Sequence, residues 1–136
     1  MAGRKRIRVY TGNFTKKVIK TGITEHDIQS NIQLELSKRG YCVFRINVGK
    51  VKTADGRWFD CGTPQGYSDL TIIKLGKVFF VEVKKPGGHV RQDQIHFLKV
   101  MKEKYGCHGG IAYSVEDAIE ICEGKVPESN KKWFKE

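Results

Sequence analysis

The chain has 136 residues, of which 39% are hydrophobic and 10% aromatic, and its formal net charge is +10. This size fits one domain with a hydrophobic core but not two. No stretch approaches the roughly 20 apolar residues of a membrane span, and the basic N-terminus is not followed by the apolar core of a signal peptide. We therefore expect an intracellular protein that makes no use of a membrane. The positive charge indicates a polyanionic partner such as nucleic acid.

The N-terminal residues concentrate this charge. Residues 1–20 contain seven basic side chains and no acidic one, which is +7 of the net +10. They fit either a basic arm or a short hairpin, and the sequence leaves both open. We divide the chain into this N-terminal segment (1–22), a central domain (23–124) and a basic C-terminal tail (125–136). Contacts to a nucleic-acid backbone are expected from Arg4, Lys5, Arg6 and Arg8.

The first predicted helix runs from Glu25 to about Arg39. Thr24 is a suitable N-cap, and Gly40 suits the left-handed residue that follows a helix. Apolar side chains at helical spacing mark the buried stripe: Ile28, Ile32 and Leu36. Glu25 lies on this same stripe, one turn nearer the N-terminus, where a carboxylate is unusual.

Two β-rich segments follow. Residues 41–48 alternate in polarity and are β-branched, which predicts a strand. Residues 51–63, with a turn at Asp55-Gly56, fit either a hairpin or a long loop. Trp58-Phe59 in this segment, like Trp133-Phe134 near the C-terminus, is a candidate for a subunit interface, with a place in the core as the alternative for Trp58.

The most informative segment is a predicted hairpin formed by residues 69–75 and 78–84, with Gly76-Lys77 as a type II′ turn. In this register Asp69 pairs with Lys84, and Thr71 pairs with Glu82. Side chains alternate along each strand, so the two acids and the lysine share one face at one end. Most other positions are apolar on both faces, as in a buried strand pair.

A second helix and a closing unit complete the domain. Pro86-Gly87-Gly88 breaks the sheet, and a helix is predicted from about Val90 to Tyr105, with Gln94 as a polar residue on its apolar stripe. A short strand at 111–113 and a small helix capped by Ser114 follow. The order α-β-β-β-α-β-α predicts an α/β fold with a mixed β-sheet flanked by helices.

Charged side chains at the end of an apolar hairpin are costly unless they pair or bind something. Asp69 and Glu82 offer carboxylate ligands for a hard cation such as Mg²⁺ or Mn²⁺, with the backbone carbonyl of Val83 as a third ligand. Lys84 would orient a water or neutralise a phosphate oxygen. Glu25 would reach the same edge from its helix. Each residue alone also has an ordinary interpretation, as an ion pair, a loop cap or a first-turn helix acid.

The pattern Gly66-Tyr67-Ser68-Asp69, twelve further residues and then Glu82-Val83-Lys84 resembles the PD-(D/E)XK nuclease superfamily. Flanking segments resemble its VRR-NUC domain, over about residues 23–123. They are Glu25-x-x-Ile28-Gln29-x-x-Ile32, Leu36-x-x-x-Gly40, Arg45-Ile46-Asn47, Gln94-x-x-Phe97-Leu98, Tyr105-Gly106 and Tyr113-Ser114-x-x-Asp117-Ala118. Ser68 stands where a proline is common in the family.

This resemblance implies a restriction-endonuclease-like fold and an Mg²⁺- or Mn²⁺-dependent endonuclease. It implies metal ligation by Asp69, Glu82, the Val83 carbonyl and Glu25, with Lys84 catalytic and Gln94 supporting the site. Stand-alone members, often phage-encoded, act as homodimers that resolve four-way (Holliday) junctions in DNA recombination and repair. A bacterial or host cytoplasm is the setting that this implies.

Further DNA contacts are expected from basic residues in the central domain: Arg45, Lys50, Lys85 and Arg91. Two alternatives stay open. One is a nuclease of the same fold that cuts flaps or single strands, and the other is a nucleic-acid-binding module whose charged cluster is structural. The four scattered cysteines contain no CxxC pair and are expected to be buried free thiols.

Overall fold

The computed structural model describes residues 24–46, 50–60 and 62–135. Residues 1–23, which hold Arg4, Lys5, Arg6 and Arg8 and the question of arm or hairpin, lie outside this range. In chain order the elements are α2 (Glu25–Lys38), β1 (Cys42–Arg45), β2 (Lys50–Lys52), β3 (Trp58–Asp60), β4 (Leu70–Lys74), β5 (Lys77–Val83), α3 (Gln92–Tyr105), β6 (Gly109–Ala112), α4 (Val115–Cys122) and the 3₁₀ helix η2 (Glu128–Asn130).

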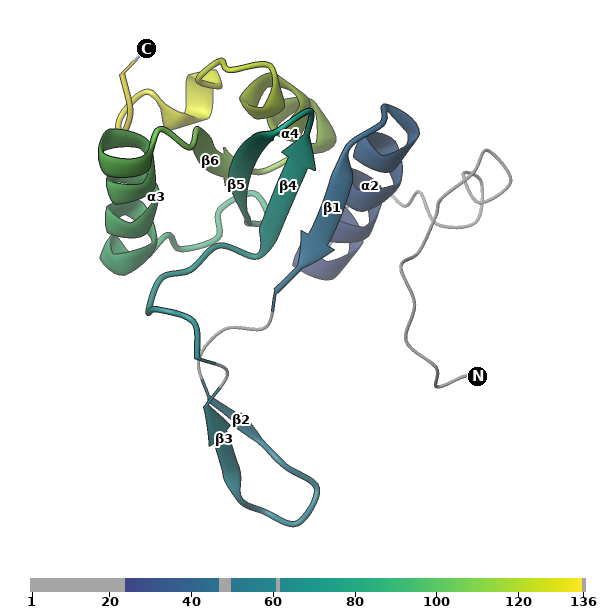
Figure 1. Cartoon of the computed structure of the whole chain (residues 1–136), viewed down its shortest axis with the longest axis vertical. Coiled ribbons are helices and arrows are strands. Elements are labelled where there is room, and N and C mark those ends of the chain that lie inside the picture. The colour runs from purple at the N-terminus through teal and green to yellow at the C-terminus, as the bar shows by residue number, and fades with distance from the viewer. Residues whose placement is uncertain (1–23, 47–49, 61, 136) are drawn as a thin grey trace.

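Four strands form a mixed sheet in the order β1-β4-β5-β6 (Figure 1). The β1–β4 and β4–β5 pairs are antiparallel, whereas β6 joins β5 in parallel after the α3 crossover. Strands β2 and β3 pair only with each other, as a separate two-stranded sheet. The predicted mixed sheet flanked by helices is therefore confirmed at this level, but the element order contains two strands more than expected. Residues 51–63 were predicted to form a hairpin or a long loop, and the structure has a hairpin there.

Helices cover both faces of the sheet, with a core on each side. On one face, α2 and α4 pack onto alternate residues of the central strands, such as Ile72 and Val81, which are fully buried. On the other face, α3 and the C-terminal residues pack around Phe80 and Ile111. The hydrophobic residues that alternate along β4 and β5 supply both cores, as expected for a strand pair buried on both sides.

The helix termini follow the predicted capping residues. The Thr24 hydroxyl accepts a hydrogen bond from the Asp27 N–H at 3.0 Å, and α2 gives way to Gly40 with φ of 91°. Gly106, with φ of 72°, ends α3, and the Ser114 hydroxyl accepts from the Asp117 N–H at 3.1 Å at the start of α4. These local signals fix where the helices begin and end.

The turn between β4 and β5 differs from the prediction. Leu75 and Gly76 form it, in place of Gly76 and Lys77, and Lys74 pairs with Lys77. Both turn residues have positive φ, 51° and 82°, which is the signature of a type I′ turn rather than type II′. Leu75 adopts this left-handed conformation without being a glycine, and its side chain is 93% exposed.

The pairing along this hairpin is consequently shifted by two residues. The predicted pairs Thr71–Glu82 and Asp69–Lys84 are wrong, because Thr71 pairs with Phe80 and Leu70 pairs with Val81. An even shift leaves every side chain on its predicted face. It also brings Asp69, which directly precedes Leu70, level with Glu82 rather than with Lys84.

The C-terminal residues pack onto the domain. Asn130 is fully buried, and its side chain bonds both backbone groups of Ile111 in β6: the amide oxygen accepts from the N–H at 2.7 Å and the amide nitrogen donates to the carbonyl at 2.9 Å. Trp133 and Phe134 contact the core beneath α3. In the part of the chain that is described, no helix is long and apolar enough to cross a membrane.

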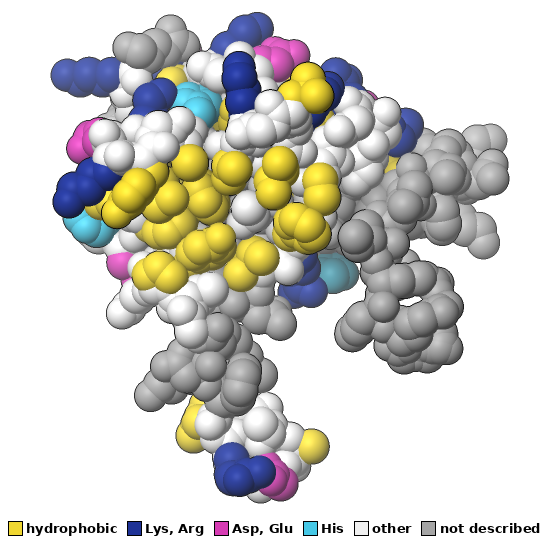
Figure 2. Space-filling view, in the orientation of Figure 1, with side chains coloured by type: hydrophobic (Ala, Val, Ile, Leu, Met, Phe, Trp, Pro, Cys, Tyr) yellow, Lys and Arg dark blue, Asp and Glu magenta, His cyan; other side chains and the backbone are white. Residues whose placement is uncertain are grey.

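One sheet face remains partly uncovered near β1. Val43 points toward the core beneath α2, so its neighbours Cys42 and Phe44 point to the opposite face. Phe44 is 39% exposed and Cys42 is an exposed free thiol, which corrects the expectation of a buried one. Cys122 is buried and free as expected, and Cys107 is free and half-buried. Figure 2 shows apolar side chains gathered on the side of the domain that faces the viewer.

Candidate active site

Glu82 is the most unusual polar residue of the sheet. It lies on the α3 side of β5, in alternation with Val81 and Val83, and is 4% exposed. One carboxylate oxygen, Oε2, accepts a 2.7 Å hydrogen bond from Gln94 Nε2. The other oxygen, Oε1, is buried and accepts no hydrogen bond from an N–H or hydroxyl of the described residues. The Asp69 carboxyl lies close enough to Glu82 for a protonated Glu82 to donate a hydrogen bond to it.

Asp69 lies beside Glu82, just before β4 begins. Its Oδ2 accepts a 2.9 Å hydrogen bond from the Val83 N–H, so the side chain supplies a rung of the ladder at the point where β4 and β5 stop pairing. The Asp69 carbonyl accepts from the Ile46 N–H at 2.9 Å, which fixes the same residue to the chain leaving β1. The preceding Ser68 is fully buried and donates to the Leu70 carbonyl at 3.3 Å. The carboxylate is therefore held by the backbone of β5, and the backbone of Asp69 is held by the residue that follows β1.

Gln94 connects α3 to Glu82. Its Oε1 accepts a 3.0 Å hydrogen bond from the Arg91 N–H at the start of the helix, which leaves the amide group free to donate to Glu82. Because the oxygen is already occupied by an N–H donor, the direction of both bonds is determined. The side chain is 5% exposed. Gln94 thus orients the Glu82 carboxylate from the first turn of α3.

Lys84 and Glu25 complete the group at different depths. Lys84 follows Glu82 on the same face of the chain, and its Nζ lies 3.8 Å from Glu82 Oε2, with the side chain 10% exposed. Glu25 is exposed at the start of α2, and its Oε2 lies 3.3 Å from the position that a Cβ on Gly88 would occupy. The structure therefore brings Asp69, Glu82, Lys84 and Gln94 together, with Glu25 at the rim beside the loop that follows β5.

Burial makes the two carboxyl groups hard to ionise together. Desolvation, followed by the negative charge of Asp69, raises the pKa of Glu82 to about 8, while Lys84 acts in the opposite direction. Desolvation also raises the pKa of Asp69, although its bond from the Val83 N–H opposes the shift. Two carboxylates that share a buried position disfavour each other's ionised form. A positive charge placed between them would remove this penalty.

A loop containing Gly66 positions Asp69 against α3. Gly66 has φ of 85°, and a Cβ on it would lie 2.2 Å from the Asp93 carbonyl oxygen, so only glycine fits. Tyr67 follows, with its ring against Phe80 and Phe97 and its hydroxyl 3.1 Å from Thr71 Oγ1. The sequence motif contained both residues, but their supporting role depends on contacts across the fold that no local pattern predicts.

This contact gives a stability prediction. Gly66→Ala should lower the free energy of unfolding by about 3 kcal/mol in urea denaturation, because it adds a clash with the Asp93 backbone to the strain of positive φ. Gly76→Ala is the matched control: its φ is 82° and nothing lies within 4 Å of the added Cβ, so strain alone acts, at about 1–2 kcal/mol. Equal losses in the two variants would contradict the close approach.

Three of the residues predicted to contact DNA lie on the surface near this end of the sheet. Arg45 ends β1, Lys85 follows Lys84, and Arg91 precedes α3; all three are exposed. The Arg91 guanidinium also forms a 3.1 Å ion pair with Asp93. Lys50 begins β2, and its side chain lies outside the description.

The site contains two carboxylates that could bind a metal ion, Asp69 and Glu82, next to the Val83 backbone. Within residues 24–46, 50–60 and 62–135, no group of three or more His, Cys, Asp and Glu side chains is arranged to hold one. Mg²⁺ is commonly bound by one or two carboxylates and keeps several waters, so the chemistry of a carboxylate pair fits it.

Comparisons of the chain with protein-family models, with curated proteins and with solved structures find no match.

Proposed function

We propose that this protein is an Mg²⁺- or Mn²⁺-dependent endonuclease that hydrolyses phosphodiester bonds in DNA. The observation that carries the proposal is the arrangement around Glu82: a buried carboxyl group with one oxygen oriented by Gln94, lying next to Asp69 and Lys84. Two carboxyl groups this close together and this well buried disfavour each other's ionised form. A bound cation would remove that cost.

Asp69 and Glu82 would hold the ion, with the Val83 carbonyl as a further oxygen ligand and Glu25 approaching from the rim. When bound, a divalent cation supplies an activated water and neutralises charge on the scissile phosphate. Lys84 lies on the same face and would orient that water or bind a phosphate oxygen. Gln94 is a positioning residue, because it acts through Glu82.

We further infer that the fold is restriction-endonuclease-like and that the chain is a relative of the VRR-NUC domain. The mixed sheet flanked by helices supports this, as does the location of Asp69 and Glu82 at one end of a central antiparallel pair. The positions of Glu25 and Gln94, each in the first turn of its helix, are consistent with it.

A branched DNA, in particular a four-way junction cut by a homodimer in an intracellular setting, is the substrate that the resemblance favours. The basic residues near the site, Arg45, Lys85 and Arg91, support a backbone-directed contact with DNA. The exposed side chains of Phe44 and Cys42 on one face of β1 support self-association, since apolar groups exposed there would be buried by a second copy. The two-fold symmetry of a homodimer would place one active site on each of two strands of the junction, as paired nicks require.

The test is cleavage of labelled four-way junction, flap and linear duplex in Mg²⁺, Mn²⁺ or EDTA. We expect paired symmetric nicks in the junction, lost in EDTA and reduced by at least about 100-fold in Asp69→Asn, with salt-dependent binding retained. Glu103→Gln, at an exposed acid of α3, serves as the control for the loss of one negative charge. Efficient cutting of linear duplex would exclude junction selectivity. Binding without cleavage in any metal would favour the non-catalytic module.

A further inference from the structure

The β2–β3 hairpin is a feature that the candidate active site does not use. It forms its own two-stranded sheet and projects away from the main sheet and its helices (Figure 1). It is inserted between β1 and β4 at the site end of the sheet, where the Ile46 N–H bonds the Asp69 carbonyl. Strand β2 begins four positions after Ile46. The projection therefore starts beside a proposed metal ligand.

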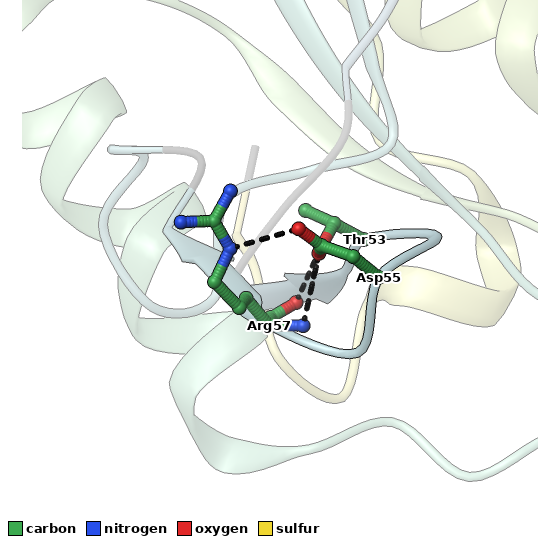
Figure 3. Close-up of polar contacts among 3 residues, drawn as sticks. All are labelled: Thr53, Asp55 and Arg57. Atoms are coloured by element: carbon green, nitrogen blue, oxygen red, sulfur yellow. Dashed lines mark hydrogen bonds and ion pairs between the residues drawn. The ribbon is translucent and has the colours of Figure 1, made fainter.

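Side chains at the tip hold the hairpin in shape. The Thr53 hydroxyl bonds the Asp55 carboxylate and accepts from the Arg57 N–H at 3.1 Å, and Arg57 Nε donates to Asp55 Oδ2 at 3.0 Å (Figure 3). Gly56, with φ of 90°, donates its N–H to the Thr53 carbonyl at 2.9 Å. An isolated two-stranded hairpin is marginally stable in water. This network compensates in part for the core that the hairpin lacks.

Trp58 is displayed on this hairpin and is 66% exposed. The location in the core that we considered from the sequence is therefore wrong. Lys52 pairs with Trp58 across the two strands, and its Nζ lies 5.9 Å from the centre of the ring. Arg57 precedes Trp58 in the sequence; its side chain is 83% exposed and its guanidinium pairs with Asp55. An exposed aromatic ring with a lysine beside it is a combination by which proteins stack on unpaired bases and bind the adjacent phosphates.

We propose that the β2–β3 hairpin binds the substrate strand by stacking Trp58 on an unpaired base near the cleavage site, with Lys52 against a neighbouring phosphate. This inference rests on the proposed function and adds the part of the substrate that the hairpin recognises. Nucleic acid is favoured over a protein partner because Lys52 lies beside the exposed ring and the hairpin begins at the site end of the sheet.

The test uses the full chain in EDTA, so that binding is measured without cleavage. The probes are a splayed-arm duplex with unpaired bases at the fork and a fully paired duplex of matching sequence. The chain has two tryptophans, so Trp133→Phe leaves Trp58 as the only one, and excitation at a wavelength that tyrosine does not absorb reports on it alone. We expect quenching of Trp58 fluorescence by the splayed-arm duplex and not by the paired one.

Anisotropy of labelled DNA gives a second measurement that does not need the Trp133→Phe background. Trp58→Ala should weaken binding to the splayed-arm duplex by about 5- to 100-fold with an unchanged salt slope, whereas Lys52→Ala should lower that slope by about one. Trp58→Phe should retain most of the affinity. Tyr105→Ala is the matched control, because Tyr105 is 67% exposed at the end of α3 and lies outside the site.

Wild-type affinity in Trp58→Ala, or equal quenching by both duplexes, would overturn the proposal, as would failure to bind either DNA. A fall in molecular mass in Trp58→Ala with unchanged DNA binding would assign the hairpin to self-association instead. The experiments distinguish failure of this proposal from failure of the proposed nuclease activity. Fluorescence quenching without cleavage in any metal would exclude nuclease activity and leave the binding role of the hairpin standing. Cleavage that Trp58→Ala leaves unchanged would exclude only the binding role of the hairpin.

Discussion

Replacing Glu82 by glutamine should abolish cleavage and, in metal-free buffer above pH 8, make the domain more stable than the wild type. The two effects have one cause: the ionised carboxylate that would bind the metal destabilises the folded state when no metal is bound. Desolvation and the charge of Asp69 raise the pKa of Glu82 to about 8. A glutamine keeps the shape, can still accept from Gln94, and can donate to Asp69 through its amide.

The sign of the pH dependence follows from these values. Unfolded Glu82 loses its proton near its ordinary pKa of 4.5, whereas folded Glu82 keeps it to about pH 8. The folded state binds the extra proton between these values, so the free energy of unfolding of the wild type falls as pH rises through this interval. The cost is fully present above about pH 8. At pH 8.5 in EDTA, Glu82→Gln should be more stable by a few kcal/mol, a gain of several degrees in Tm.

Added Mn²⁺ should reverse the order, since an ion that binds only the folded wild type stabilises it by mass action. Thermal unfolding at pH 5 and 8.5, with EDTA or Mn²⁺, measures both effects. Glu103→Gln on the exposed side of α3 is the matched control, and it should change neither Tm nor cleavage. If Glu82→Gln were less stable than the wild type in EDTA at pH 8.5, the cluster would be a structural ion-pair network.

Lys84→Met should reduce cleavage by at least about 100-fold and leave DNA affinity within about twofold of the wild type. The Lys84 side chain is 10% exposed and points at the carboxylates, so its charge acts on the reacting phosphate or water and not on the wider DNA surface. Lys84 also lowers the pKa of Glu82, so the variant should need a higher pH to bind Mn²⁺.

The neighbouring lysine separates these roles. Lys85 is exposed and follows Lys84 directly, so Lys85→Met should weaken binding, lower the salt slope by about one and leave the rate of the bound complex unchanged. Single-turnover cleavage and salt-dependent anisotropy on the same junction distinguish the two variants. A wild-type single-turnover rate in Lys84→Met would show that Lys84 takes no part in the cleavage step.

The helices were predictable from the sequence because their ends are determined locally. A hydroxyl at Thr24 or Ser114 can bond the N–H three residues on, and Gly40 or Gly106 can adopt positive φ, without help from the rest of the fold. The same holds for the buried stripe of α2, which follows the spacing of its apolar side chains.

The register of the β4–β5 hairpin was not predictable by the same reasoning. Turn chemistry favours glycine at the first position of a two-residue turn, but the structure has Leu75 there, in a conformation that a leucine rarely adopts. Packing on both faces of the strands overrides the local preference. The candidate site was predicted nonetheless, because faces depend on the parity of the pairing and the error was even.

The features of the site that could not be predicted from the sequence depend on contacts between elements far apart in the chain. The bond from Gln94 to Glu82 joins the start of α3 to β5, and the approach of Gly66 to Asp93 joins a loop to the same helix. Alternation and spacing place a residue on a face, but they do not say which residue of another element lies opposite it. The partly exposed face around Phe44 likewise depends on where α3 crosses the sheet.

The side chain of Asn130 has a consequence for how copies of this protein can meet. Strand β6 is at the edge of the sheet, and such an edge normally offers unpaired amides to a strand from another molecule. Asn130 occupies both backbone groups of Ile111 and so acts as a one-residue substitute for a neighbouring strand. Intermolecular sheet extension is blocked at this point of β6, which leaves association through faces or through the opposite border at β1.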